Sequence, residues 1–505
     1  MMEQIVTALA RLTVNEACAI EYSPTSLPLK ASRSGVCENL DSDLLLSSLA
    51  TATGATQTAL ELSWRQVFCA VDQLADQLAA QGIRPGDGIG LIGKNSLPQL
   101  LLYLAGLSLG ARVMAVNPQF PAEKIERLFQ QNHIGYYFSP CTAAFSCRRI
   151  VLNALGFEAD YRRQTALLWQ RGYSMTLTSG SGGEPKAVVH DIRAHWQNAL
   201  GVNEFLAFTH DNAWLLSLPL YHVSGQGIVW RWLGAAACLH FGAADFYQAI
   251  GKVSHVSLVP TQLQRYLDYL SDRNLPPQTV RTEAILLGGA HIDPELCRRA
   301  YAAGLKTFSG YGMTEMASTV FVRRNDPQQA EVRLLRGREL CIRDGEIWLR
   351  GAGLAAGYWQ QGKIMPLLNA EGWYQTKDRG HWQNGELQVL GRIDNLFISG
   401  GENIQPEEIE SVLQQFPLIE QVVVLPLADM EFGARPVAML RFNQPFSTVL
   451  VAQVRSWLQT RIERFKQPIA YYPLPRNDDP NQIKISRKRL LQDLQQQLQS
   501  TQPSE

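Results

Sequence analysis

A run of small residues that ends in a lysine offers the most specific chemistry in this sequence. It contains Thr178, Ser179, Gly180, Ser181, Gly182, Gly183 and Lys186. Glycines let backbone N–H groups approach a polyphosphate, hydroxyls add donors, and the lysine supplies a cation. The common phosphate loop has a hydroxyl residue after its lysine to hold Mg²⁺, whereas Ala187 stands here. The run therefore predicts a different phosphate-binding loop, with a flexible Gly/Ser linker as the alternative.

Three further strings could complete a nucleotide site. They are Gly288-Gly289-Ala290, the string Tyr311-Gly312-Met313-Thr314-Glu315, and Asp378. The glycine pair could leave backbone open to a flat ring, and the second string combines an aromatic face, a hydroxyl and a carboxylate suited to Mg²⁺. The aspartate could accept ribose hydroxyls. Taken singly, each string also has a structural explanation, such as a solvated loop aspartate.

Alternating helices and strands must position these strings. Helices are predicted from Trp64 to just before Gly82 and over 97–109, 191–207, 225–234, 261–271 and 293–303. Strands are predicted over 89–92, 112–116, 173–177, 213–218, 255–259 and 283–287. This alternation is typical of doubly wound α/β layers.

The rest of the chain has a different character. Short alternating strands over 333–391 indicate a small β-rich module. Helices over 406–415 and 450–463, with strands over 419–426 and 436–442, predict a compact α+β C-terminal domain. Residues 1–60 lack clear periodicity and are expected to be peripheral or poorly ordered.

Composition limits the kind of partner. Lys+Arg and Asp+Glu number 46 each, so no overall field favours nucleic acid or an anionic membrane. The eight cysteines form no C-x-x-C pair, which argues against a zinc site or a disulfide framework and favours a reducing, cytoplasmic location. No signal peptide or membrane span is expected, because the most apolar stretch, 100–116, carries Arg112.

Together and in this order, the strings resemble the acyl-adenylate-forming superfamily of acyl- and aryl-CoA ligases, over about residues 62–490. The resemblance implies two steps with ATP, Mg²⁺ and coenzyme A: a carboxylate attacks the α-phosphate, and the CoA thiol then displaces AMP. It implies that residues 178–186 wrap the β- and γ-phosphates, Thr314 touches the α-phosphate and Glu315 holds Mg²⁺. Tyr311 and Gly289, with Gly288, Ala290 and Gly312 beside them, would flank adenine, and Asp378 with Arg392 would bind ribose.

The same resemblance implies a mobile C-terminal domain. Lys484 matches the catalytic lysine of the first step, Asp394 matches the hinge, and His222 matches a position at the acyl pocket. The implied organisation is a large AMP-binding domain over 61–391, a hinge over 392–394 and a small domain over 395–505. A lone histidine in an apolar stretch is also commonly a packed core residue.

Several segments resemble the branch of this superfamily that ligates 2-succinylbenzoate to CoA in menaquinone biosynthesis. They are residues 218–233, 257–262, 317–319, 396–410 and 483–487. Arg231 lies between Trp230 and Trp232, and burying an unpaired guanidinium costs several kcal/mol (roughly), so an anion should meet it. In that branch the matching arginine faces the aromatic carboxylate, with Ser224, Ser257 and Thr319 around the substrate. An arginine that reaches solvent or pairs with a protein carboxylate is the alternative.

Two departures from the superfamily pattern leave other functions open. Gly182 replaces a threonine of the phosphate loop, and Asn481-Gln482 stand where a glycine usually precedes the catalytic segment. Another aryl- or acyl-CoA ligase is one alternative, and an adenylate-binding protein without turnover is another. A homodimer is compatible with the sequence, which does not fix the oligomeric state.

Overall fold

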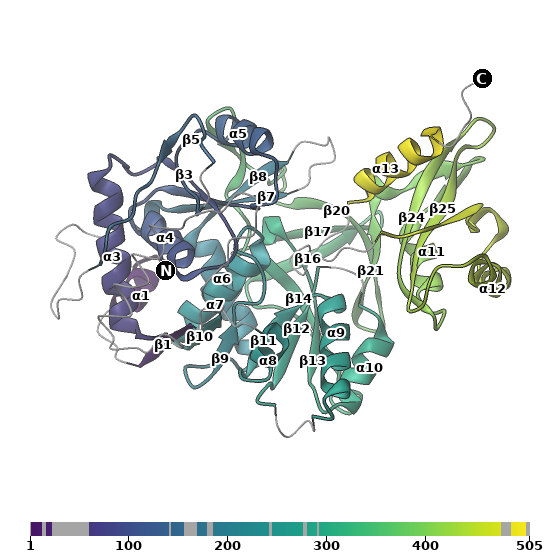
Figure 1. Ribbon diagram of the computed structural model, residues 1–505, viewed down its shortest axis with the longest axis horizontal. Helices are drawn as coiled ribbons and strands as arrows, with labels where there is room; N and C mark the ends of the chain where they lie inside the picture. Colours follow the sequence, from purple (N-terminus) through teal and green to yellow (C-terminus); the bar gives the residue numbers. More distant parts are fainter. Residues whose placement is uncertain are drawn as a thin grey trace, which may run out of the picture. The chain divides into compact units, whose positions relative to one another are not determined.

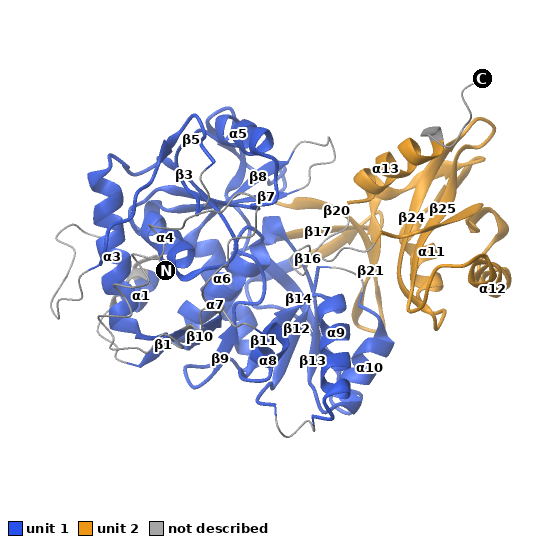
Figure 2. Cartoon of the chain, in the orientation of Figure 1, with its two compact units in different colours: residues 1–339, 350–372 blue, residues 340–349, 373–505 orange. Residues whose placement is uncertain are grey.

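The computed structural model describes residues 2–12, 17–22, 60–140, 143–155, 169–178, 185–241, 245–275, 280–289, 292–475 and 486–500. The chain forms two compact units, residues 1–339 with 350–372 and residues 340–349 with 373–505 (Figure 2). Some predicted site residues lie outside the described segments: Ser179, Gly180, Ser181, Gly182, Gly183, Ala290 and Lys484. The departures from the superfamily pattern at Gly182 and at Asn481-Gln482 lie there too.

A nine-stranded sheet forms one half of unit 1 (Figure 1). Its strands, in order across the sheet, are β15 (Glu331–Leu334), β14 (Ser318–Arg324), β13 (Thr307–Met313), β12 (Ala284–Leu287), β11 (His255–Leu258), β9 (Ala213–Leu215), β10 (Cys238–Phe241), β1 (Cys18–Tyr22) and β2 (Leu60–Ser63). Strands β13 to β1 run parallel, whereas β2, β14 and β15 pair antiparallel at the two edges. The carboxyl ends of the parallel strands therefore meet at one edge, where ligands usually bind.

An eight-stranded sheet forms the other half of unit 1. Its order is β19 (Lys363–Met365), β18 (Gly357–Gln360), β8 (Lys186–Asp191), β7 (Tyr173–Thr178), β4 (Arg112–Val116), β3 (Gly88–Ile92), β5 (Ile134–Phe138) and β6 (Arg148–Arg149). The strands from β7 to β6 are parallel, and β8, β18 and β19 continue the sheet antiparallel.

Helices cover and separate these sheets. They are α1 (Met2–Leu12), α3 (Trp64–Ala80), α4 (Leu97–Ser108), α5 (Ala122–Gln131), α6 (Ile192–Leu206), α7 (Val223–Ala235), α8 (Phe246–Ile250), α9 (Pro260–Asp272) and α10 (Pro294–Ala302). Helix α3 begins as predicted, because Ser63 and Gln66 form a reciprocal capping box. Helix α7 is buried from Gly225 to Leu233 and packs along α6 (Figure 1).

Unit 2 contains two smaller sheets. The first has the order β16 (Arg338–Arg343), β17 (Glu346–Gly351), β20 (Tyr374–Gln383) and β21 (Glu386–Arg392). The second joins β22 (Phe397–Ser399), β23 (Glu402–Ile404), β24 (Ile419–Asp429), β25 (Gly433–Phe442) and β26 (Ala470–Pro473). Helices α11 (Pro406–Leu413) and α12 (Thr448–Leu458) pack on one face of the second sheet, and α13 (Arg487–Ser500) packs on the other.

The structure confirms the predicted α/β class with a smaller C-terminal domain, and it differs in three places. Residues 18–22 are not peripheral: β1 lies inside the nine-stranded sheet, with Ala19 and Ile20 fully buried. The two units divide around residues 340 and 373, so residues 373–391 belong to the second unit, where β20 pairs with β17 and β21 pairs with β20. The hinge expected at 392–394 stays a prediction. The helix predicted over 450–463 ends at Leu458, where the chain turns before a short 3₁₀ segment.

No helix in the described part of the chain combines the length and the apolarity that crossing a membrane requires.

Candidate active site

The ends of the predicted phosphate loop lie on two paired strands. Thr178 closes β7 and Lys186 opens β8, and the two residues are opposite each other in the antiparallel ladder. Lys186 is exposed, with its Nζ 5.2 Å from the centre of the Tyr358 ring. The lysine therefore begins a strand, whereas in a common phosphate loop it begins a helix.

The turn that carries Thr314 and Glu315 is held from two neighbouring strands. It is a single 3₁₀ turn, Thr314–Met316, between β13 and β14. The Tyr358 hydroxyl donates a 2.7 Å hydrogen bond to Glu315 Oε1, and Glu315 is only 8% exposed. His190 Nε2 lies 2.7 Å from the Thr314 carbonyl oxygen. Burial lowers the pKa of His190 to about 4, so the ring is neutral and donates this hydrogen bond from Nε2.

Glycines bring backbone to the edge of the sheet. A Cβ at Gly312 would lie 1.9 Å from the Ser318 carbonyl oxygen, so only glycine fits beneath this turn. Gly288 and Gly289 follow β12, and Gly289 has a φ of 84°. Since β12 pairs in parallel with β13, these glycines lie beside Gly310 and Tyr311 at the carboxyl ends of the strands. The predicted adenine-flanking residues that the structure describes therefore lie on adjacent strands.

The start of α7 carries two of the predicted acyl-pocket residues. His222 occupies the N-cap position and Ser224 lies in the first turn, and both are partly buried. The His222 ring packs edge-on against Tyr221, with 4.8 Å between ring centres. His222 is thus not enclosed in the core.

Arg231 lies on the same helix and is 1% exposed. Its guanidinium donates to Ser257 Oγ at 3.3 Å, Ser318 Oγ at 3.3 Å and Thr319 Oγ1 at 3.4 Å. It also lies over the Trp214 ring, 5.1 Å from the centroid. Within the described residues it forms no ion pair, and its Nε has no hydrogen-bond partner. The partners are neutral hydroxyls and a ring, so the pocket holds a positive charge that no described carboxylate balances.

Two features of the surroundings define this pocket. Gly227, one turn before Arg231, leaves room for the guanidinium: a Cβ there would lie 3.2 Å from Arg231 Nη2. Burial, and then the nearby charge of Arg338, lowers the pKa of Arg231 to about 9, which leaves it protonated at neutral pH. An anion bound beside Arg231 would offset both the cost of burying its charge and its repulsion from Arg338.

Arg338 provides a contrast within the same unit. It is also buried, but its guanidinium donates to the backbone carbonyls of Gln197, Asn198 and Thr319 at 3.1 to 3.3 Å. The carbonyl dipoles stabilise this charge, and the hydrogen bonds link the backbone segments around Arg338. Arg338 therefore has a structural role, whereas the partners of Arg231 are side-chain hydroxyls; within the described residues, the Nε of each arginine lacks a hydrogen-bond partner.

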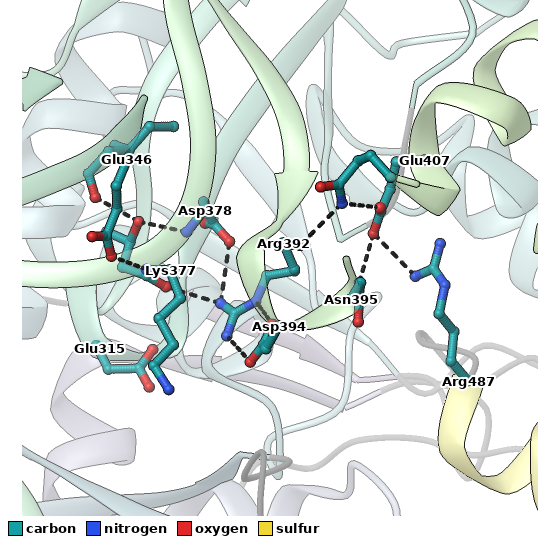
Figure 3. Close-up of polar contacts among 12 residues, drawn as sticks. Glu315, Glu346, Lys377, Asp378, Arg392, Asp394, Asn395, Glu407 and Arg487 are labelled. Atoms are coloured by element: carbon teal, nitrogen blue, oxygen red, sulfur yellow. Dashed lines mark hydrogen bonds and ion pairs between the residues drawn. The ribbon is translucent and has the colours of Figure 1, made fainter. Parts of the chain in front are cut away.

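In unit 2, the guanidinium of Arg392 lies between two carboxylates (Figure 3). Asp378 on β20 faces Arg392 on β21, and Arg392 Nη1 donates to Asp378 Oδ1 at 3.1 Å. Arg392 also donates two hydrogen bonds to the Asp394 carboxylate, from Nε to Oδ1 at 3.0 Å and from Nη2 to Oδ2 at 3.1 Å. Burial opposes the charge of Asp394, yet the hydrogen bonds and charge of Arg392 outweigh it and lower the pKa of that carboxyl.

Side chains on and after α11 continue this network within unit 2 (Figure 3). Asn395 donates to Glu407 Oε1 at 2.6 Å, and Arg487 lies 3.4 Å from the same carboxylate. Arg487 also pairs with Glu410, whose carboxylate accepts from the Val424 amide at 2.7 Å. Burial raises the pKa of Glu410, against the opposing influence of Arg487. Arg487 thus ties the start of α13 to α11.

The sequence analysis missed several residues that shape these sites. They are Ser318, Trp214, Gly227 and Arg338 around Arg231, and His190 and Tyr358 around Thr314 and Glu315. Ser318 directly precedes the predicted Thr319, so the pair of hydroxyl residues was a usable signal. Gly227 lies one turn before Arg231 on the same helix. The remaining residues come from other segments of the chain, and their proximity depends on the tertiary fold.

The described residues offer one candidate Mg²⁺ ligand but no complete metal cage. Among them, no three His, Cys, Asp or Glu side chains gather closely enough to hold a metal ion. Among the described residues, the Tyr358 hydroxyl is the side-chain hydrogen-bond partner of the Glu315 carboxylate. One carboxylate supplemented by phosphate oxygens and water is a usual Mg²⁺ environment, so Glu315 fits that role.

Comparisons with known proteins agree with this geometry. A family model described as AMP-binding enzyme matches residues 50–359. The 2-succinylbenzoate–CoA ligase of Haemophilus influenzae is 51% identical over 429 residues, which are 85% of this chain and 92% of that protein. The enzyme of the same name from Escherichia coli is 42% identical over 440 residues, or 86% and 94% of the two chains.

Solved structures show the same likeness. An arginine-to-lysine variant of Escherichia coli MenE with bound OSB-AMS is 42% identical, with a TM-score of 0.76 over 86% of this chain and 94% of that one. The O-succinylbenzoate CoA synthetase of Bacillus subtilis in complex with AMP, 24% identical, has a TM-score of 0.72 over 85% and 93% of the two chains and supports the fold. The resemblance to the adenylate-forming superfamily is thereby confirmed.

The unbalanced charge of Arg231 should reduce stability when no ligand is bound. Replacing Arg231→Leu removes a buried guanidinium, so we expect the free energy of unfolding to rise by about 1–3 kcal/mol. Urea unfolding followed by tryptophan fluorescence, with no ligand present, measures this change. The matched variant Arg338→Met removes the side-chain donor of four backbone carbonyls and should lose about 2–4 kcal/mol. A clear loss of stability in Arg231→Leu would mean that a protein group already balances the charge.

Proposed function

Since the chain belongs to the AMP-binding enzymes and, among them, to the 2-succinylbenzoate–CoA ligases, we propose that it joins 2-succinylbenzoate to coenzyme A with the consumption of ATP. The reaction proceeds through an acyl-adenylate and releases pyrophosphate and AMP. Its product serves menaquinone biosynthesis. The enzyme is an AMP-forming acid–thiol ligase.

The observation that carries this function is the buried, unbalanced guanidinium of Arg231. 2-Succinylbenzoate has two carboxylates, and only the succinyl carboxylate is activated. The aromatic carboxylate remains charged throughout and needs a permanent cation. The Arg231 guanidinium lies beside the hydroxyls of Ser257 and Thr319 and can donate two parallel hydrogen bonds to a carboxylate. A fatty acid offers no second anion for this pocket.

The first step requires two anions to meet. The succinyl carboxylate must approach the α-phosphate, so cations and oriented donors have to offset their repulsion. We assign Thr314 to the α-phosphate and the segment from Thr178 to Lys186 to the outer phosphates. The exposed Lys186 on β8 and the fixed turn at Thr314 support this assignment. Lys484, which would bridge the carboxylate and the α-phosphate, lies outside the described residues.

Glu315 is proposed to hold Mg²⁺, which when bound neutralises phosphate charge. The Tyr358 hydroxyl keeps the Glu315 carboxylate in one orientation, and His190 fixes the preceding carbonyl. The two Glu315 carboxylate oxygens are therefore held in a fixed orientation beside Thr314. Tyr311, Gly288 and Gly289 flank adenine, together with Gly312, and Asp378 binds the ribose hydroxyls near Arg392.

The second step requires the acyl-adenylate to meet the CoA thiol. We propose Asp394 as the hinge for this change. Its carboxylate is gripped by Arg392 at two positions, so a rotation there breaks a defined pair of hydrogen bonds. His222 and Ser224, at the start of α7, are proposed to line the acyl pocket. We also propose a cytoplasmic location, which suits the free thiols of the described cysteines, and a homodimer stays a prediction.

The substrate assignment is tested by CoA-thioester formation with 2-succinylbenzoate, benzoate and a medium-chain fatty acid in parallel. We expect a large preference for 2-succinylbenzoate. In Arg231→Leu the kcat/KM for this acid should fall by roughly 100-fold or more, because the aromatic carboxylate loses its charged partner. Activity with benzoate should change little, which serves as the internal control. A preference for benzoate in the unchanged enzyme would point to another aryl-CoA ligase.

The assignment of Lys484 is tested by measuring the two half-reactions separately. Lys484→Ala should abolish adenylation, measured as pyrophosphate release, because the approaching anions lose their bridging cation. Thioester formation from supplied acyl-adenylate and CoA should be retained. Lys488→Ala, a nearby exposed lysine on α13, is the matched control and should affect neither step. Equal loss of both half-reactions in Lys484→Ala would contradict the assignment, and an unchanged enzyme without pyrophosphate release would favour a non-catalytic adenylate-binding protein.

A further inference from the structure

Two cysteines far apart in the sequence have their sulfur atoms side by side. Cys18 Sγ lies 3.5 Å from Cys238 Sγ, at the start of the parallel strands β1 and β10. The register of these strands pairs Ile20 with Leu239, so the two thiols lie at neighbouring positions of one ladder. Both thiols are free, with Cys18 exposed and Cys238 half-buried. Only a small further approach of the sulfur atoms would allow a covalent bond.

The surroundings of the two thiols make them chemically unequal. The hydrogen bond from Cys238 lowers the pKa of the Cys18 thiol and raises that of Cys238. Burial and the nearby carboxylates of Glu21 and Glu61 oppose the change at Cys18 without reversing it. Cys18 is therefore the better nucleophile as well as the more accessible sulfur. Cys238, whose pKa is raised, lies next to it in the protonated form.

We propose that Cys18 and Cys238 are a pair of thiols that peroxide oxidises to a disulfide. This modification site is distinct from the adenylation and acyl sites. The Cys18 thiolate attacks hydrogen peroxide, which breaks the O–O bond and gives a sulfenic acid and, after proton uptake, water. The Cys238 sulfur then attacks the Cys18 sulfur and displaces the hydroxyl group, which leaves as a second water with the Cys238 proton. Overall, two thiols and one peroxide give one disulfide and two waters.

The bond would link β1 covalently to β10, the strand that follows the helix carrying Arg231. Strand β1 is otherwise held in the sheet by β10 and β2 and by the Trp232 indole, which donates to the Ala19 carbonyl at 2.9 Å. Cys238 follows α7 by only a few residues, and Trp232 directly follows Arg231 on that helix. A disulfide at Cys18 thus joins β1 covalently to the start of β10, three residues after the end of α7, and restricts the unfolded chain between residues 18 and 238.

The experiment treats the full-length protein with hydrogen peroxide in modest excess and then blocks the remaining thiols. We expect the loss of two titratable thiols and a cross-linked peptide containing Cys18 and Cys238, both reversed by dithiothreitol. The thermal midpoint of the oxidised protein should exceed that of the reduced protein by about 5 °C. A chain that remains monomolecular on non-reducing gels excludes a bond between two copies.

Matched variants identify the two sulfurs. Cys18→Ser and Cys238→Ser should each abolish the cross-link and the thermal shift, and Cys18→Ser is exposed enough to fold normally. Cys69→Ser is the control, because this half-buried thiol has a raised pKa caused by burial and has Gln73, not a second thiol, at its sulfur. It should leave both effects unchanged. An intact thiol count after peroxide treatment, or a cross-link that persists in Cys18→Ser, would overturn the proposal.

Discussion

The burial of the Arg231 guanidinium among neutral groups is the central constraint in unit 1. Moving an ion from water into a protein interior is expensive unless an opposite charge or oriented dipoles meet it. Arg231 is met by three hydroxyls and a tryptophan ring, which solvate the charge without neutralising it. The surrounding fold supplies the energy that keeps this charge buried. Under the proposed function, a carboxylate ligand would relieve this deficit on binding, so Arg231 would link low local stability to substrate selection.

One short segment joins this pocket to the nucleotide site. Thr314 and Glu315 form the 3₁₀ turn after β13, and Ser318 and Thr319 begin β14, which returns alongside β13. Gly312 is required for the return, because a Cβ at this position would collide with the Ser318 carbonyl oxygen. A shift of this turn that moved Glu315 would also move the hydroxyls around Arg231. Under the proposed function, recognition of the acid and placement of the α-phosphate would depend on the same few backbone bonds, so that reaction would be favoured only when both ligands fit.

The sequence predicted what local patterns encode and missed what the fold brings together. Capping by Ser63, the apolar periodicity of α7 and the strand at 112–116 are properties of neighbouring residues, and the structure agrees with them. The ordered motifs placed the residues around Arg231 through a resemblance. His190 and Tyr358 carried no such signal, because each is hydrogen-bonded to a residue far along the chain. Strand β1 was missed for the same reason: five residues become a strand only because β10 and β2 flank them.

The network in unit 2 explains how a hinge at Asp394 could act on a distant lysine. Asn395, next to the hinge, is bonded to Glu407 on α11. Arg487, three residues after Lys484, is bonded to Glu407 and Glu410 on the same helix. Because both attachments converge on α11, a change of backbone angle at residues 393–395 must carry the start of α13 with it. Under the proposed function, the rotation that breaks the Arg392–Asp394 pair would also withdraw Lys484, and Asp378 would keep its bond to Arg392.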